Sequence, residues 1–201
     1  MSYESLRLPL RLIALAFLTV VVQEAAVSQV SIFGTSADLT PLVVMAVGLL
    51  AGSIPGAIMG FGVGLLVDLL LFQTLGVTSL LYIVIGYWSG RLRELRDPSH
   101  GLVPMGLGAG ATAFAGIGMT LMQFLLGVDS PVSLLLMQQI LVTVLVNTLL
   151  ALPIYAAVKQ VIEPTLPQDP RRRRRRAYTT GGLSPLQQSS ARLGPTPRPS
   201  R

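Results

Sequence analysis

Hydrophobic runs separated by short polar links fill most of this chain, and they constrain its fold more than any other feature. Of its 201 residues, 51% are hydrophobic and 12% are charged, whereas about a quarter of the residues in a soluble domain carry charge. This composition excludes a soluble globule. The sequence therefore predicts an all-α, polytopic membrane protein.

Six of the runs are predicted to cross the membrane as helices of a single bundle. The first run resembles a signal peptide, but Gln23 and Glu24 stand just before the small residues of a possible cleavage site, so we expect an uncleaved helix. The expected spans are residues 8–30, 39–50, 55–72, 77–90, 102–126 and 133–158. Several are shorter than the about 20 residues of a perpendicular crossing, so spans two and three are also compatible with one bent hairpin.

The links between the predicted spans are short and polar. Residues 52–55 and 73–76 are expected to be tight turns, because both contain glycine next to polar residues or proline. Residues 91–100 are the most polar internal stretch, and we expect them to form a loop in water.

Basic residues indicate the orientation of the spans. If the N-terminus is cytoplasmic, all fifteen Lys and Arg residues fall on cytoplasmic segments, and the two predicted outer loops, residues 31–38 and 127–132, contain none. The positive-inside rule therefore predicts that both termini are cytoplasmic. An even number of crossings follows.

Composition changes after residue 163 to proline, arginine, serine and glycine without apolar periodicity. We therefore expect a transmembrane domain of residues 1–163 and a disordered cytoplasmic tail of residues 164–201. Basic residues expected to set topology and contact anionic lipid are Arg91, Arg93, Arg96, Arg171, Arg172, Arg173, Arg174, Arg175 and Arg176. Nucleic acid is not an expected partner, because no folded basic domain or interleaved aromatic residues accompany the arginines.

Small residues form one face of the third predicted span. Gly56, Gly60 and Gly64 recur every four residues, Gly62 widens the same surface, and Asp68 is the next residue on this ridge. In lipid, small residues let a neighbouring helix approach to backbone contact, and a carboxylate must face protein or water. The ridge therefore predicts a packing face, either for the chain's own helices or for another membrane protein.

Polar residues within the predicted spans are candidates for a buried pocket. Glu24 and Asp68 are expected at a similar depth in the outer part of the membrane, where Gln123 can join them. Gln139 and Asn147 lie on one face of the sixth span, which we expect to point into the bundle.

The sequence contains few residues of the kinds that catalytic sites use. The chain has no cysteine and one histidine, His100, which excludes Cys and His metal clusters. No glycine loop carries the lysine and hydroxyl of a nucleotide-phosphate site, and no Ser/His/Asp arrangement is evident. We therefore expect a non-enzymatic protein without a cofactor.

A combination of short motifs resembles one bacterial family. An ADL triplet at residues 37–39 precedes the motif GFxxGLxxD, which begins at Gly60; LG follows at residues 75–76, and GYxxGRL begins at Gly86. Over about residues 8–160 this pattern resembles the rod shape-determining protein family MreD. Phe72 and Gln73 stand where the family tends to have a Ser-Gly-like turn, and the tail has no family counterpart.

The resemblance implies a non-enzymatic scaffold in the inner (cytoplasmic) membrane of a bacterium. Such proteins sit beside the bitopic protein MreC, and together they link MreB filaments to RodA and the penicillin-binding transpeptidase that build lateral cell wall. The residues that would serve helix packing or partner contact are Gly56, Gly60, Gly64, Asp68, Gly76, Gly86 and Gly90.

A transporter subunit is the alternative. Substrate-binding membrane subunits of energy-coupling-factor transporters have a similar six-helix architecture, and a pocket near Glu24 and Asp68 would suit a vitamin or a metal. These subunits usually present an Ala-x-x-x-Ala face on the first helix, but here Ala14 is followed four residues later by Leu18. The absence of this motif favours the scaffold.

Overall fold

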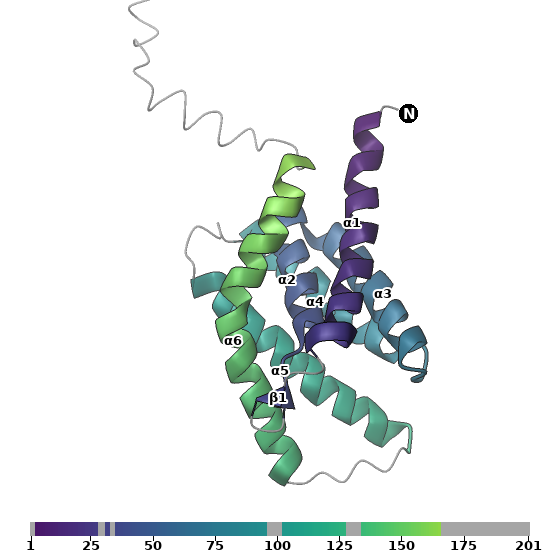
Figure 1. The fold of residues 1–201 in the computed structure, drawn as a ribbon, viewed down its shortest axis with the longest axis vertical. Coiled ribbons are helices and arrows are strands. Elements are labelled where there is room, and N and C mark those ends of the chain that lie inside the picture. The colour runs from purple at the N-terminus through teal and green to yellow at the C-terminus, as the bar shows by residue number, and fades with distance from the viewer. Residues whose placement is uncertain (1–2, 28–30, 33–34, 96–101, 128–133, 166–201) are drawn as a thin grey trace, which may run out of the picture. The chain divides into compact units, whose positions relative to one another are not determined.

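Helices make up almost all of the structure. The computed structural model describes residues 3–27, 31–32, 35–95, 102–127 and 134–165, and by its internal contacts the chain divides into Met1–Leu166 and Pro167–Arg201. The predicted tail lies outside the described residues and stays a prediction. The α-helices are α1 (Tyr3–Val22), α2 (Leu39–Ala51), α3 (Ser53–Leu70), α4 (Val77–Leu95), α5 (Leu102–Leu125) and α6 (Leu134–Ile162) (Figure 1).

Shorter elements occur at two helix ends and in one connection. A π-helical turn, η1 (Gln23–Val27), continues α1, and a 3-10 turn, η2 (Glu163–Thr165), follows α6. The two-residue strands β1 (Ser31–Ile32) and β2 (Thr35–Ser36) pair antiparallel between α1 and α2. The prediction of an all-helical architecture is confirmed apart from this small hairpin.

Among the described residues, four stretches are long and apolar enough to cross a membrane: Leu8–Ala25, Ser53–Leu70, Leu102–Leu125 and Leu135–Ile162. The chain is therefore a multi-pass membrane protein. The helix α2 is apolar but only 13 residues long, which corresponds to about 20 Å. The helix α4 has 19 residues, and its last turns include Arg91, Arg93 and Glu94. The predicted count of six crossings depends on these two helices.

Two predicted links differ from the structure. Gly52 alone joins α2 to α3, with φ of 108°, and α3 begins at Ser53. Pro55 lies in the first turn of α3, where an N–H has no partner within the helix. The predicted turn at 52–55 was therefore wrong beyond Gly52. The predicted loop at 91–100 was also wrong at its start, because α4 continues to Leu95.

The helix α2 is the centre of the bundle. Every residue from Thr40 to Leu50 is buried, and α3, α4, α5 and α6 all pack against it (Figure 1). An apolar surface on all sides is typical of a helix enclosed by others. In contrast, α1, α5 and α6 expose large side chains such as Phe17, Phe124 and Leu149, as expected where a helix faces lipid.

Candidate functional site

The helix α4 of the same chain occupies the glycine ridge of α3. A side-chain carbon added at Gly60 would collide with the backbone of Tyr82, and one added at Gly64 would collide with the backbone of Ser79. Ser79 also donates a hydrogen bond through its hydroxyl to the Phe61 carbonyl, at 3.4 Å. The backbones of α3 and α4 are therefore in direct contact, as small residues permit.

Glycines of three helices meet at the other end of this ridge. A carbon added at Gly48 of α2 or at Gly56 of α3 would lie 2.5 Å from the carbonyl oxygen of Gly86 in α4. A carbon added at Gly90 would collide with the backbone of Ser53. The motif glycines thus hold α2, α3 and α4 together at distances that no larger residue allows.

Gly62, predicted to widen the ridge, and Gly76, expected to serve helix packing, have other surroundings. Gly62 has no neighbouring atom within 4 Å of an added carbon, so it does not widen the contact with α4. Gly76 precedes α4 with φ of 93°, a conformation that favours glycine, and an added carbon there also meets no atom.

Asp68 fixes the turn between α3 and α4. Its side chain is fully buried, and its Oδ2 accepts a hydrogen bond from the Gly76 N–H at 2.7 Å. Its carbonyl accepts a second one from the Gln73 N–H at 3.0 Å. The Asp of the GFxxGLxxD motif therefore binds the Gly of the LG motif. Within the described part of the chain, Asp68 Oδ1 and Thr78 Oγ1 are buried without a hydrogen-bond partner.

Phe72 lies in the same turn, with an unusual backbone conformation. Its φ is 51°, a left-handed conformation that glycine adopts easily and a bulky residue rarely does. Its side chain is 95% exposed. The turn thus keeps a glycine-like backbone although the sequence supplies a phenylalanine.

Gln23 of η1 holds the segment that leads into α2. Its side-chain nitrogen donates to the Ala37 carbonyl at 3.0 Å, and its side-chain oxygen accepts from the Leu39 N–H at 2.8 Å. Sequence reasoning placed Gln23 in the first span but did not identify this role.

Asn147 of α6 holds the same segment from the other side. Its Oδ1 accepts from the Asp38 N–H at 3.2 Å, and its Nδ2 donates to the Asp38 carbonyl at 2.7 Å and to Thr112 Oγ1 of α5 at 3.0 Å. The Asp38 carboxylate in turn accepts from the Thr40 N–H at 3.0 Å and caps α2. An Asp directly before an apolar run is a helix-start signal that identifies Asp38 from sequence.

Burial also affects the charge state of Asp38. Desolvation raises the pKa of its carboxyl above the ordinary value, against the opposing effect of its hydrogen bond with Thr40, and the nearby charge of Glu24 adds to the rise. We name the set of Gln23, Asp38, Thr112 and Asn147 the entry clamp, because it binds the chain where it enters α2.

The five residues of the predicted polar pocket occupy different places. Asp68 lies in the α3–α4 turn and Asn147 in the entry clamp, whereas Gln139 is exposed and Gln123 is half-buried. Of Gln139 and Asn147 on α6, it is therefore Asn147 that enters the bundle. Glu24 is half-buried and makes an interaction of its own.

Two cavities, of about 380 and 320 Å³, have none of these five residues in their walls. Among the described residues no cluster of acidic side chains or His fits a metal ion.

Two arginine side chains donate hydrogen bonds to backbone carbonyls near the C-terminal ends of helices. Arg93 donates to the carbonyl of Leu50 near the end of α2, and Arg11 donates to the carbonyl of Val161 near the end of α6, at 3.0 Å. Cations are favourable there because the C-terminal end of a helix carries partial negative charge. Arg91 is exposed and makes an interaction, while Arg96 and Arg171 to Arg176 lie outside the described residues.

Comparison with known proteins identifies one family. A family model described as rod shape-determining protein MreD matches residues 6–161. The match begins in α1 and ends in α6. Neither the curated proteins nor the solved structures gave a match.

Proposed function

This chain belongs to the MreD family of rod shape-determining proteins, and we propose that it is a non-enzymatic inner-membrane scaffold of the bacterial cell-elongation machinery. Family membership by itself implies that the chain is a non-catalytic membrane protein with a role in rod-shape determination. In the proposal, the chain binds MreC within the membrane. It thereby helps to couple MreB filaments to RodA and the elongation transpeptidase, which synthesise lateral peptidoglycan.

The match of the family model over residues 6–161 is the observation that carries this proposal. It spans nearly the whole unit Met1–Leu166 and leaves the tail outside. The transport-subunit alternative needs a pocket near Glu24 and Asp68. Neither described cavity includes these residues, so no observation favours that alternative.

Six crossings with both termini in the cytoplasm are part of the proposal. The hydrogen bond from Arg11 to the Val161 carbonyl joins the start of α1 to the end of α6, and Figure 1 shows these two ends at the same side of the bundle. This arrangement supports an even number of crossings. Because the chain has no cysteine, single cysteines at positions 97 and 129 can report the sidedness. In intact cells an impermeant maleimide is expected to label position 129 and not position 97.

The packing of α3 restricts where a partner can bind. Since α4 covers the ridge of Gly60 and Gly64, we place MreC elsewhere on the bundle. The cavity of about 320 Å³ between α4 and α5 includes Trp88, Gly106, Gly110 and Phe114 in its wall. An added carbon at Gly106 or Gly110 meets no atom within 4 Å, so a partner helix has room to approach there.

Complementation tests the function, and co-purification tests the surface. In a rod-shaped bacterium depleted of its own MreD, the chain is expected to restore rods and to co-purify with MreC. Gly110→Leu is expected to reduce co-purification, whereas Gly62→Leu, which also enters open space, is expected to preserve it. Round cells despite abundant inserted protein would contradict the function. Equal MreC recovery with both variants would contradict only the surface.

A further inference from the structure

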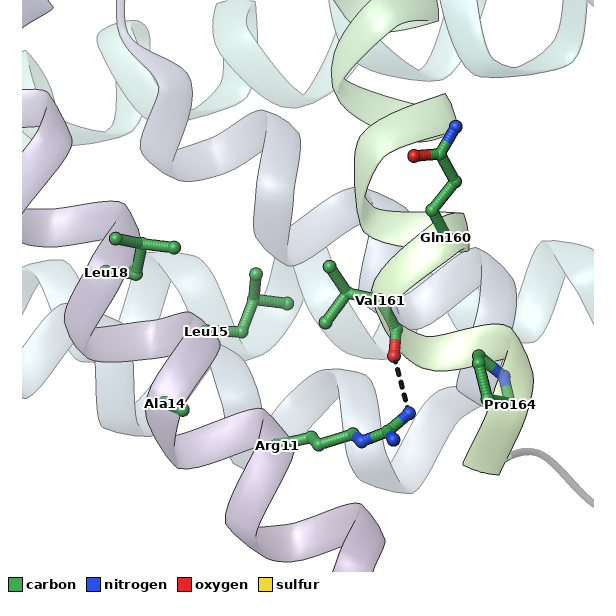
Figure 2. Close-up of a pocket in the computed structure, with 7 residues that line it drawn as sticks. All are labelled: Arg11, Ala14, Leu15, Leu18, Gln160, Val161 and Pro164. Atoms are coloured by element: carbon green, nitrogen blue, oxygen red, sulfur yellow. Dashed lines mark hydrogen bonds between the residues drawn. The ribbon is translucent and has the colours of Figure 1, made fainter.

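A groove between α1 and the end of α6 combines one charged side chain with apolar walls. On α1 the lining residues are Arg11, the adjacent pair Ala14 and Leu15, and Leu18. Residues three, four and seven positions apart share one face of a helix. The cavity has a volume of about 380 Å³. Its walls are formed by Arg11, Ala14, Leu15, Leu18, Gln160, Val161 and Pro164 (Figure 2).

Arg11 provides positive charge at one end of this groove. Figure 2 shows its side chain reaching from α1 toward α6, beside Pro164. One N–H group of the guanidinium donates to the Val161 carbonyl at 3.0 Å, and a guanidinium has five such donors in total. Its planar fork matches the oxygens of a phosphate group. No acidic residue lines the groove.

The other end of the groove is apolar and lies deeper in the membrane. Arg11 directly precedes the hydrophobic run that begins at Leu12, so its charge marks the membrane boundary. Leu18 is seven residues further along α1, which is about 10 Å. Leu18 is 58% and Val161 42% exposed, and Leu15 is buried beneath them. A complementary ligand therefore carries an anionic head and a hydrocarbon chain.

We propose that this groove binds one anionic phospholipid, with its phosphate on Arg11 and an acyl chain along Leu15, Leu18 and Val161. The site differs from the arginine run of the tail, because it sits between two described helices and has an apolar floor. Lys159 precedes Gln160 and Glu163 precedes Pro164 in the sequence, so these neighbouring charges balance, and Arg11 is the charged residue of the wall. The bound lipid adds contacts between α1 and α6 to the hydrogen bond from Arg11 to the Val161 carbonyl.

Photo-crosslinking of the full-length protein in membranes tests this site. The probes are phosphatidylglycerol and phosphatidylcholine, each with a photoactivatable group on one acyl chain, and peptide mass spectrometry locates the labels. With phosphatidylglycerol, labels are expected on the peptides that contain Leu15, Leu18 and Val161. With phosphatidylcholine, labelling is expected to be about fivefold weaker, which is the effect of about one basic contact.

Two pairs of variants separate the groove from general surface charge. Ala14→Trp fills the groove, whereas Ile13→Trp places the same indole at an exposed position outside it. Arg11→Gln removes the charge, and Arg91→Gln removes a charge at the end of α4. Only the first variant of each pair is expected to reduce labelling by phosphatidylglycerol about fivefold.

The lipid site is wrong if Ala14→Trp and Ile13→Trp label alike, or if both lipids label the wild-type groove equally. Labels spread evenly over all outer helix faces would also contradict it. If Ala14→Trp instead releases a co-purified protein while lipid labelling is unchanged, the occupant is a protein and the proposal fails. Each variant is compared at equal amounts of inserted, monodisperse protein, so a folding defect is recognised separately.

Discussion

Buried polar side chains in this bundle bind backbone groups that its helices leave open. Asp68 holds the N–H of Gly76 before α4, and Asn147 holds both backbone groups of Asp38 before α2. Within a bilayer no water replaces such partners, so each unpaired backbone group has a free-energy cost. These side chains therefore stabilise the connections between the spans.

Asp68→Leu is expected to lower the free energy of unfolding by about 1 kcal/mol, because the Gly76 N–H loses its acceptor. This loss of stability is at the low end of the range for an unpaired N–H, because Gly76 is exposed and water can bind its N–H. Asp68→Asn keeps an acceptor oxygen and is expected to retain most of the stability. Thermal unfolding in detergent checks both variants. Equal midpoints for Leu and wild type would show that the hydrogen bond does not stabilise the turn.

Asn147→Leu is expected to cost about 2 kcal/mol, because the Asp38 backbone and Thr112 lose a shared partner. Gln139→Leu is the matched control on the same helix. Its side chain is exposed, so we expect a change within about 0.5 kcal/mol. Denaturant titration in detergent measures the difference between the two variants. A similar loss for both would contradict the role of the entry clamp.

Contact between α3 and α4 depends on positions without a side chain. The GFxxGLxxD and GYxxGRL motifs belong to the two helices that meet, so in this chain both motifs mark an internal contact. Their glycines reduce helix propensity, and close packing offsets this cost.

Gly60→Ala and Gly62→Ala add the same methyl group, the first at a position that contacts α4 and the second at a position that does not. At position 60 the methyl group collides with the backbone of Tyr82, and we expect a loss of about 2 kcal/mol. At position 62 it meets no atom, and we expect unchanged stability or a gain of up to about 1 kcal/mol from helix propensity. Unfolding midpoints of the two proteins provide the comparison. Equal midpoints would exclude close packing at Gly60.

For the molecule as a whole, the helical unit and the tail are expected to act separately. Truncation after Gln168 is expected to leave the helical content and MreC co-purification unchanged, because Met1–Leu166 is a compact unit and the family match ends at residue 161. Circular dichroism and co-purification measure the two properties. Loss of either property in the truncated protein would show that the tail supports assembly.

Much of this architecture is predictable from the sequence, because each helix depends mainly on the residues of its own apolar run. The apolar runs predict α2, α3, α5 and α6 to within a few residues, because lipid selects helices of sufficient length and hydrophobicity. The start of α4 was also correct. Its end was not, because Arg91 and Arg93 are polar yet remain helical, and Arg93 caps α2.

The class of the protein, its helices and the positions of its small or polar side chains can be read from the order of the residues alone. What these positions contact follows only from the packed bundle. A glycine ridge has the same pattern whether a neighbouring or a foreign helix covers it, and here α4 covers it. Asp68 and Asn147 likewise bind backbone groups of two different connections, one before α4 and one before α2. Residue spacing fixes which side chains share a helix face, but the packing of the whole bundle fixes which atoms lie opposite.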